Sequence, residues 1–594
     1  MIRLRAALIV MTMILSLFGA RLFQLQGVDP NDYAAAAAAT GLVTLDLPAT
    51  RGQILDRNGT PLAESVDGLM IVADPSRTKD HAEEIAKILA DRLHLDYFDV
   101  LATLQKATTK SGNPNHFAYI ARRIPSTLAT SVVAEIDKPK DAQGRPLYAG
   151  IDTRRDPLRN YPAGDVAANL LGFMGANGDL SAGGGGLEQS FNKMLAGKDG
   201  TETYEVGGNN RIPLGENTEV KPVNGQNLHL TIDRDVQWYA QRAVRTAVQH
   251  SGADSGAAIA MDTQTGEILA LADYPTFDAN NPGASKKDDL GARSLSDVYE
   301  PGSVEKTLTT SALINLGRVS PRTKIALPAN QIGGAGLTVA DRVIHDYFNH
   351  PKIHLTLAGV IALSSNIGTA LAATKFKPGE LPTYLHDFGL GQRSNIGIPG
   401  ETAGLVPSGN WSDLTRSEVA FGQGISVNAL QMVTAVNAIA NGGQLVTPSL
   451  IEGRATTGAG AAVGTAMTTR RQVITPETAR KETSMMEMVT TQGAGTAPEA
   501  KVPGYRTAGK TGTAQEVGAT CKCYDGSLDV SFAGFAPADK PRFTVYVVIK
   551  NPRSAGAGGG VTAGPPFREI LSYLLQKYAV PPTETPPAAL PIEW

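Results

Sequence analysis

Three short motifs in the sequence combine residue types that can carry out nucleophilic chemistry. Ser303 and Lys306 are three residues apart, just after Pro301-Gly302, and Ser364-Ser365-Asn366 and Lys510-Thr511-Gly512-Thr513 follow later in the chain. A lysine one helical turn from a serine can accept the hydroxyl proton of an otherwise unreactive nucleophile. Two interpretations follow: a serine nucleophile with its base, or the start of an ordinary helix.

The spacing alone does not separate these interpretations. Pro-Gly cannot continue a helix and serine is a good residue to begin one, so we expect a helix to start at Ser303. The same serine-lysine spacing occurs at Ser76 and Lys79, and similar decoys exist for the other two motifs. Taken singly, each residue is better explained as a helix cap, a solvated lysine or a turn glycine.

The composition is that of a large folded protein. The chain of 594 residues is 42% hydrophobic and 19% charged, which suggests about three or four domains of roughly 150 residues. With a net charge of -3, the chain lacks the excess of positive charge that nucleic-acid binding requires, so we expect no nucleic-acid partner. The nine histidines form no His-Glu-x-x-His and the cysteines no Cys-x-x-Cys, so we expect no metal or other cofactor. Two cysteines suit an extracytoplasmic protein without a disulfide framework.

The N-terminus predicts a membrane anchor. Residues 6–20 are almost entirely apolar, and the run continues to Leu25 past Arg21. It reaches the ~20 residues of a membrane span if Arg21 extends to the outer interface. Arg3 and Arg5 predict a cytoplasmic N-terminus, with the chain outside after residue 26. A cleaved signal peptide is the alternative, but no clear small-x-small cleavage site follows the run.

The region before residue 225 mixes strands and helices. We expect a juxtamembrane segment over 27–48, with a helix at 34–39, and a mixed domain over 49–224. Asn58-Gly59 predicts a hairpin turn, and apolar periodicity predicts helices over 81–93 and 97–106. The glycine run at 183–186 lacks a following Lys-Thr, so we interpret it as a turn leading into a helix rather than a phosphate loop.

The rest of the chain predicts an α+β domain. Residues 228–233 read as a strand, 234–247 as a helix, and 257–273 as two strands joined by a turn at 263–266. Helical patterns dominate from 303 to about 440, and strand patterns return at 505–516, 530–538 and 542–552 before a helix at 567–578. The sheet would therefore be assembled from both ends of the domain. The proline-rich tail, 581–594, is expected to be disordered.

The contexts of the three motifs decide between the interpretations. EPGSVEK, IALSSNIGTAL and AGKTGTAQ occur in that order, and the chain also contains RGQILDRNGTPLA, GLEQSFNKMLAG, LTIDRDVQ and FGQGISV. In these stretches, which span most of residues 22–580, the sequence resembles the class B penicillin-binding proteins, the monofunctional peptidoglycan transpeptidases. The resemblance implies an anchor at 1–26, a non-catalytic, dimerisation-type pedestal at 49–224 and a transpeptidase domain at 225–580. The last would be an antiparallel sheet flanked by helices, like a serine β-lactamase.

The resemblance also implies a role for each motif residue. Ser303 would attack the carbonyl between two D-alanines of a stem peptide and form an acyl-enzyme. Lys306 would be its base, with an amine kept partly neutral by burial beside Lys510. Ser364 would relay a proton between the lysines and the leaving nitrogen. Asn366 would hold the substrate peptide group through its amide.

The third motif would bind the substrate. Lys510 would supply positive potential for the terminal carboxylate, and Thr511 or Thr513 a hydroxyl contact to it. Gly512 would allow the substrate close to a strand edge, where it can pair as an added strand. The backbone N–H groups of Ser303 and Thr513 would form the oxyanion hole. An amine from a neighbouring stem peptide would then complete the cross-link.

The family contains division-specific and elongation-specific enzymes. ATRGQILDRNGTPLAESVD and YEPGSVEK are more similar to the septal, division-specific type. In that case the anchor and the pedestal would bind a polytopic glycan polymerase and other division proteins. β-Lactams would acylate Ser303, because their strained amide mimics the D-alanyl-D-alanine end.

Several alternatives remain within and outside this family. A serine β-lactamase or β-lactam receptor needs no domain of ~200 residues before its active site. A D,D-carboxypeptidase differs only in using water where the transpeptidase uses an amine, and motifs do not separate the two. A catalytically idle division scaffold would be expected to have lost one of the motif residues. A bifunctional synthase would carry a glycosyltransferase where residues 49–224 resemble a pedestal.

Two features add to the pattern. Glu305 lies between Ser303 and Lys306, where we expect it to point away from the pocket, although a charge there could tune the site. Cys521 and Cys523 follow the third motif in an expected loop near the cleft mouth. A disulfide between residues two apart would be strained, and we expect a pair of free or locally bridged cysteines rather than a redox switch or metal clip.

Overall fold

The computed structural model describes residues 2–24, 42–108, 115–175, 183–207, 210–211, 217–517 and 523–594. The chain forms two compact units, and both are discontinuous in sequence. The first unit comprises Met1–Arg51, Val66–Leu158 and Gly197–Gly225; the second comprises Gly52–Ser65, Arg159–Ala196 and Gln226–Trp594. The boundaries 49–224 and 225–580 expected from the sequence stay a prediction.

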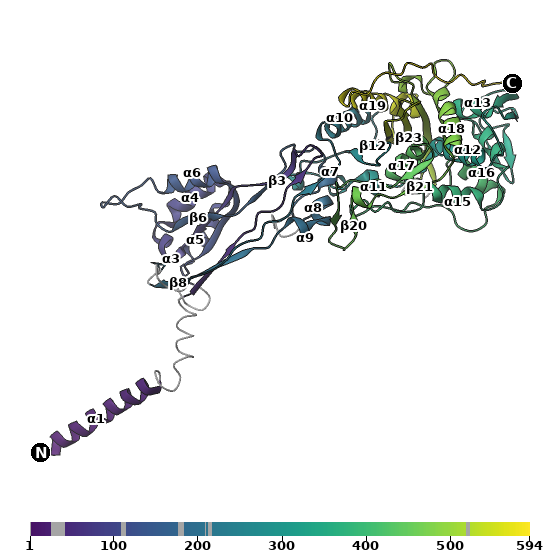
Figure 1. The fold of residues 1–594 in the computed structure, drawn as a ribbon. Helices are drawn as coiled ribbons and strands as arrows, with labels where there is room; N and C mark the ends of the chain where they lie inside the picture. Colours follow the sequence, from purple (N-terminus) through teal and green to yellow (C-terminus); the bar gives the residue numbers. More distant parts are fainter. Residues whose placement is uncertain are drawn as a thin grey trace. The chain divides into compact units, whose positions relative to one another are not determined.

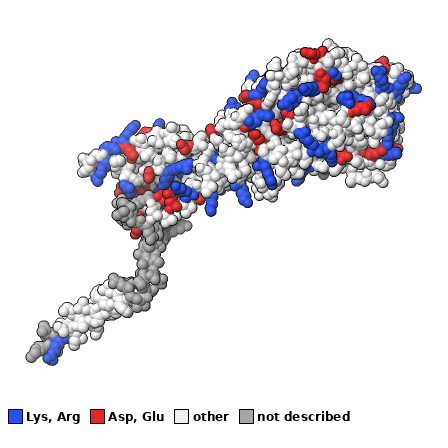
Figure 2. Space-filling view, viewed as in Figure 1, with Lys and Arg blue, Asp and Glu red and all other residues white. Residues whose placement is uncertain are grey.

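The N-terminal helix α1 (Ile2–Phe23) carries the apolar run. Its stretch Arg5–Phe23 is long and apolar enough to cross a membrane, judged by length and composition. Large apolar side chains such as Leu8 and Phe18 are more than half exposed there, and Figure 2 shows a helix surface almost free of charge. The helix expected at 34–39 lies outside the described residues.

The first unit contains a small sheet covered by helices. The strand order is β5 (Ala118–Pro125), β4 (Gly68–Ala73), β6 (Ile151–Arg155), with antiparallel pairing throughout. Helices α4 (Ala82–Leu93), α5 (Tyr97–Gln105) and α6 (Ser126–Ile136) share one apolar core with this sheet. Helices α4 and α5 confirm the helices predicted from apolar periodicity. A second sheet pairs β8 (Gly200–Gly207) with β1 (Leu42–Leu47) on one side and β10 (Asn217–Val220) on the other.

The second unit is built on a five-stranded antiparallel sheet. Its order is β13 (Ile268–Tyr274), β12 (Ser255–Asp262), β24 (Phe543–Lys550), β23 (Tyr524–Ala536), β22 (Ala508–Val517). Strands β12 and β13 form the predicted hairpin, and the three last strands of the chain pair beside it. The prediction of a sheet assembled from both ends of an α+β domain is confirmed. Strand β22, which carries the third motif, is the edge strand.

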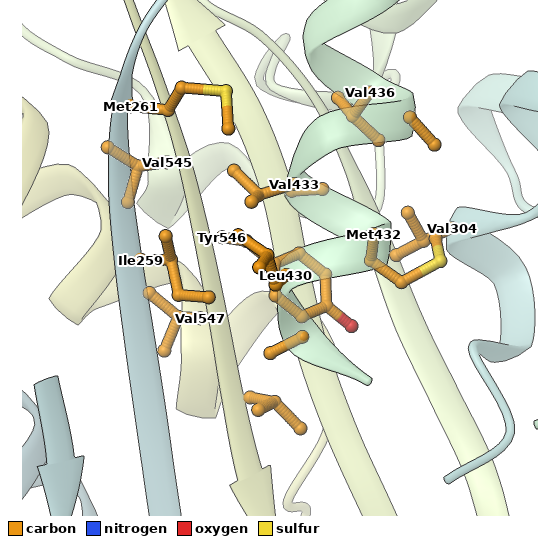
Figure 3. Packing of buried hydrophobic residues seen from close by; sticks show 14 of the residues in the cluster. Ile259, Met261, Val304, Leu430, Met432, Val433, Val436, Val545, Tyr546 and Val547 are labelled. Carbon is orange, nitrogen blue, oxygen red and sulfur yellow. The ribbon is translucent and has the colours of Figure 1, made fainter. Parts of the chain in front are cut away.

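Helices cover both faces of this sheet. Helices α10 (Arg234–Ser251) and α19 (Gly564–Lys577) pack against one face, and α17 (Ala429–Ala440) and α18 (Pro476–Val489) against the other (Figure 1). Helix α12 (Lys306–Asn315) packs in turn against α17 and α18. The hydrophobic core fills the space between the sheet and the helices on each of its two faces. Figure 3 shows part of it, with Leu430 and Val433 of α17 close to Tyr546 of β24. The first two motifs lie in this helical layer.

The C-terminal tail is ordered against the second unit, so the expectation of disorder was wrong. Thr583 N donates to Gly504 O at 3.0 Å, and Ala588 N donates to the Glu487 carboxylate at 2.7 Å. Further on, Thr356 N donates to Ile592 O at 2.8 Å. Thr356 caps α13 (Leu357–Ala362), the helix that leads into the second motif. A proline-rich composition predicts that the tail forms no helix or strand. It gives no information about hydrogen bonds to segments that are distant in sequence, and these bonds order the tail.

Candidate active site

Ser303 lies in a 3₁₀ turn, Gly302–Val304, immediately before α12. The helix begins at Lys306 and its N-cap is Glu305, so the prediction that the helix starts at Ser303 was wrong by three residues. Gly302 has a φ of 53°, a left-handed conformation that favours glycine and delays the helix. The Ser303 side chain is half-buried, and its hydroxyl makes no hydrogen bond to another described residue.

The turn is held by close backbone packing on two sides. Gly302 N donates to Gly422 O at 3.1 Å, and a Cβ added at Gly422 would lie 2.0 Å from Gly302 O. On the other side, a Cβ added at Gly302 would lie 2.7 Å from Thr513 O. The backbones of the serine turn and of Thr513 are therefore neighbours. At Gly512 an added Cβ would meet Ser531 Oγ at 2.2 Å and Pro301 O at 3.0 Å, so the close approach there is to the chain's own turn.

Lys306 is fully buried and points at the second motif. Its Nζ donates to Ser364 O at 2.6 Å and to Asn366 Oδ1 at 2.7 Å, and lies 3.4 Å from Ser364 Oγ. Burial lowers the pKa of Lys306 to about 7, against the opposing effect of the nearby Asp346 and Glu305 carboxyls. A substantial fraction of this amine is therefore neutral at neutral pH and able to accept a proton.

The Ser364 hydroxyl lies between two buried amines. Lys510 Nζ donates to Ser364 Oγ at 2.8 Å, and Lys306 Nζ approaches the same oxygen from its own side. Ser364 has a φ of 57°, an uncommon value for a residue other than glycine. Burial, with the charge of Lys306, holds the pKa of Lys510 well below its usual range. Ser364 Oγ therefore links the two lysine amines in one chain of hydrogen bonds.

The third motif continues this network along the edge of the sheet. Lys510 Nζ also donates to Thr511 Oγ1 at 3.0 Å, and Thr511 Oγ1 lies 3.2 Å from Thr496 Oγ1. Thr513 is exposed, whereas Thr511 and Lys510 are buried. Among the described residues, β22 pairs with β23 alone, so its outer side is open to a further strand.

The Asn366 amide is already engaged at both ends. Its Oδ1 accepts from Lys306, and its Nδ2 donates to His345 O at 2.9 Å. In this structure Asn366 thus orients the Lys306 amine. A side-chain amide has two N–H groups, so one remains for the substrate contact predicted from the sequence, which stays a prediction.

Asp346 lies behind the second motif, and the sequence did not single it out. It is 1% exposed, and its carboxylate accepts from Ser365 Oγ at 2.7 Å and from Ile367 N at 3.0 Å. Ser365 in turn caps α14 (Asn366–Ala373). No sequence motif identifies an isolated aspartate whose partners are a backbone N–H and a hydroxyl. Its burial and its partners become visible only in the fold.

Two buried carboxyl groups contact threonines of α12, namely Glu305 at its start and Glu482 of α18. Glu305 is fully buried and accepts from Thr309 Oγ1 at 2.9 Å, and among the described residues it makes no hydrogen bond to the motif residues. Burial raises the pKa of Glu305 well above its usual range, against the opposing effects of Thr309 and Lys306. Glu482 of α18 lies 2.8 Å from Thr310 Oγ1 and is also fully buried.

Glu482 is expected to be protonated in the folded protein. The Thr310 hydroxyl lies 2.8 Å from both Lys306 O and Glu482 Oε2 and has one proton to donate to the two. Burial raises the Glu482 pKa well above its usual range. The folded state therefore retains a proton that the unfolded chain releases, and stability falls as pH rises from the usual carboxyl range toward the raised pKa.

Replacing Glu482 with Gln should remove this pH dependence. We expect Glu482→Gln to unfold at about the same temperature as the wild type near pH 4 and about 2–4 °C higher at pH 8. Thermal unfolding followed by circular dichroism between pH 4 and 9 measures this. Glu477→Gln, on the exposed side of the same helix, is the matched control. If the unfolding temperature changes with pH equally in the wild type and in Glu482→Gln, the Glu482 carboxyl is ionised in the folded protein.

The other sequence features lie apart from this network. Ser76 Oγ, from the decoy pair with Lys79, donates to Asp74 Oδ1 at 2.5 Å. Cys523 is disulfide-bonded, and Cys521 lies outside the described residues. Within the described ranges, no group of three or more His, Cys, Asp or Glu side chains is placed to hold a metal ion.

Two family models match the chain. Residues 256–572 match the penicillin binding protein transpeptidase domain, and residues 46–230 match the penicillin-binding protein dimerisation domain. All three motifs lie within the first match. The N-terminal match covers most of the first unit and the segments interleaved with it.

Relatives of known sequence or structure match over nearly the whole chain. The penicillin-binding protein PbpB of Mycolicibacterium smegmatis is 34% identical over 97% of this chain and 91% of its own length. The peptidoglycan D,D-transpeptidase FtsI of Escherichia coli K12 is 31% identical over 95% of this chain and 89% of its own length. The crystal structure of penicillin binding protein 3 from Mycobacterium tuberculosis in complex with aztreonam superposes with a TM-score of 0.68. It is 31% identical and covers 92% of this chain and 100% of that chain.

Proposed function

The chain belongs to the class B penicillin-binding proteins, and on this premise we propose that it is a peptidoglycan D,D-transpeptidase acting through an acyl-enzyme on Ser303. The observation that carries the proposal is the Ser364 hydroxyl held between the buried amines of Lys306 and Lys510. This arrangement supplies a base and a proton path for a serine nucleophile one turn away. The relatives named above are penicillin-binding proteins or peptidoglycan D,D-transpeptidases.

Acylation begins with proton transfer from Ser303 to Lys306. The depressed pKa of Lys306 leaves its amine partly neutral, and the contacts to Ser364 O and Asn366 Oδ1 fix its position. Ser303 Oγ attacks the carbonyl carbon between the two D-alanines, and a tetrahedral oxyanion forms. The backbone N–H groups of Ser303 and Thr513 bind this oxyanion. Their proximity follows from the packing of Gly302 against Thr513.

Collapse of the tetrahedral intermediate breaks the C–N bond. The proton taken up by Lys306 passes through Ser364 to the leaving nitrogen, and the terminal D-alanine departs with it. Lys510 and Thr511 bind the carboxylate of that D-alanine. A negative charge beside Lys510 favours its cationic form, so the carboxylate itself restores the charge that burial disfavours in the empty site.

An amine of a second stem peptide then attacks the acyl-enzyme. The base that accepts its proton is again Lys306, through the same path in reverse. The open edge of β22 can hold the donor peptide as an added strand, with Gly512 and Thr513 along it. A D,D-carboxypeptidase would use the same residues with water as the attacking group.

The cellular setting is part of the same proposal. Helix α1 anchors the protein in the plasma membrane, with the N-terminus in the cytoplasm and both units outside. The enzyme works in septal cell-wall synthesis during division, with an elongation role as the alternative. The anchor and the first unit bind a polytopic glycan polymerase and other division proteins.

Covalent labelling by a fluorescent penicillin tests the proposed nucleophile. The full-length protein in detergent should form a stable acyl-enzyme, and intact-protein and peptide mass spectrometry should place the label on Ser303. Ser303→Ala should abolish labelling, whereas Ser76→Ala, in the decoy pair, should not change it. A folded wild type that is not labelled would contradict the proposal and favour an idle scaffold.

Product analysis separates the alternatives that share the acyl-enzyme. With lipid-linked peptidoglycan and a glycan polymerase present, we expect cross-linked dimers of stem peptides. Trimmed stem peptides without cross-links would identify a carboxypeptidase. Rapid hydrolysis of the penicillin label would identify a β-lactamase.

A further inference from the structure

The Asp346 carboxylate has one further partner, a buried histidine. His350 Nε2 lies 3.1 Å from Asp346 Oδ2, and the side chains are 4% and 0% exposed respectively. The same carboxylate holds the second motif through Ser365 Oγ and Ile367 N. His350 therefore contacts the second motif only through Asp346, the residue that binds the motif directly.

Both nitrogens of the His350 ring face hydrogen-bond acceptors. Nε2 faces the Asp346 carboxylate, and Nδ1 lies 2.7 Å from Pro351 O. A neutral imidazole has only one N–H and could satisfy one of these contacts. Only a ring with a proton on each nitrogen would donate to both acceptors.

The backbone and the ring of His350 are both fixed. His350 N donates to Asn330 O at 3.0 Å and Asn330 N donates to His350 O at 2.9 Å. The Asn330 side chain donates to Phe348 O at 2.7 Å, and the Phe348 ring lies 5.2 Å from the imidazole. The position of the cation is therefore set by the fold and not by the ion pair alone.

The ion pair lies within electrostatic reach of Lys306. The Asp346 charge favours the protonated Lys306 amine. Among the described residues, Asp346 is the only ionisable group in direct contact with the His350 ring, and Tyr347 also interacts with that carboxylate. A cation on His350 offsets part of the Asp346 charge, which makes it easier for Lys306 to be neutral.

We propose that His350 is a positioning residue for this active site. Through its ion pair with Asp346 it steadies the second motif and offsets the carboxylate charge that Lys306 experiences. It touches neither the nucleophile nor the substrate, and it acts through Asp346. The inference rests on the proposed function, because it concerns the base of Ser303.

The pH profile of acylation tests this role. Neutral Lys306 is the reactive form, so the acylation rate should rise through the Lys306 pKa. In His350→Gln the carboxylate charge is no longer offset, and the rising limb should move to higher pH. We expect a shift of about half a unit to one unit, or roughly threefold to tenfold slower acylation near pH 6.5. The rates at pH 9 should stay close to those of the wild type.

Two further variants separate charge from packing. His350→Lys keeps a cation within reach of Asp346, so its acylation rate should rise at the same pH as that of the wild type. Any effect of altered packing should slow acylation equally at every pH. His354→Gln removes an exposed histidine of β17 (Ile353–Thr356), away from Asp346, and should leave the profile unchanged. The measurement is the second-order rate of fluorescent-penicillin labelling of the full-length protein from pH 5.5 to 9.5.

The outcomes are distinguishable from failure of the proposed function. A wild type that forms no acyl-enzyme on Ser303 contradicts the proposed function. A wild type that acylates normally, with a His350→Gln profile that is lowered evenly or unchanged, overturns the role of His350 alone. The role of His350 is supported if the rise of the acylation rate moves to higher pH in His350→Gln and stays at the wild-type pH in His350→Lys.

Discussion

Replacing Lys306 with alanine is expected to slow acylation of Ser303 by about a thousandfold, within the 10²–10⁴-fold range typical of a lost general base. The Lys306 amine is buried and contacts Ser364 and Asn366 of the second motif, and burial lowers its pKa to about 7. Lys510 does not replace it, because Lys510 Nζ is occupied by Ser364 and Thr511. The residual rate should also lose its dependence on pH near 7.

Stopped-flow or quenched-flow labelling with a fluorescent penicillin measures this loss. Lys79→Ala removes the exposed lysine of the decoy pair and should label at the wild-type rate. Thermal unfolding of both variants identifies any loss of folding. Labelling of Lys306→Ala within tenfold of the wild type would contradict the role of Lys306 as the base.

Replacing Gly422 with alanine should be almost as damaging, although Gly422 carries no reactive group. An alanine Cβ would lie 2.0 Å from Gly302 O, and backbone atoms cannot accommodate that distance. The carbonyl of Gly302 and the turn that carries Ser303 would have to move away. The Ser303 N–H would then leave the proposed oxyanion hole, and loss of one donor there costs about 10²–10³-fold in rate.

Gly424→Ala is the matched control for this variant. Gly422 and Gly424 both have positive φ values, 89° and 72°, so alanine strains the backbone at either site. At Gly424, however, the nearest atom to an added Cβ is 4.0 Å away. We expect Gly424→Ala to keep most of its acylation rate. Equal losses in the two folded variants would assign the effect to backbone strain rather than to displacement of the serine turn.

The sequence predicted the elements and the motif residues well, because both have local signatures. Alternating apolar residues identified β12 and β13, and the contexts of the three motifs identified the residues that the fold brings together. The helix start was missed because Gly302 packs against Gly422 and Thr513, which are distant in sequence. The tail was missed for the same reason, since its partners, such as Gly504 and Thr356, are elsewhere in the chain.

The residues behind the motifs could not be predicted from the sequence. Asp346 and His350 are four residues apart in a stretch without periodicity, and neither belongs to a recognisable pattern. Their significance depends on burial and on the Asp346 carboxylate, which contacts both Ser365 and the His350 ring. Likewise, nothing in the sequence places Glu482 beside Thr310. Such groups are defined by tertiary contacts between side chains.

The order of strands in the central sheet also constrains how the protein reaches its folded state. Strand β12 is buried along its whole length, and its second neighbour, β24, is one of the last elements of the chain. If the part of the chain after α1 emerges in sequence order, β12 and β13 appear long before β24. Until then, β12 presents an unpaired apolar edge, which is the form of surface that promotes aggregation. We therefore expect the second unit to complete its sheet only after β24 has been synthesised and is free to pair with β12.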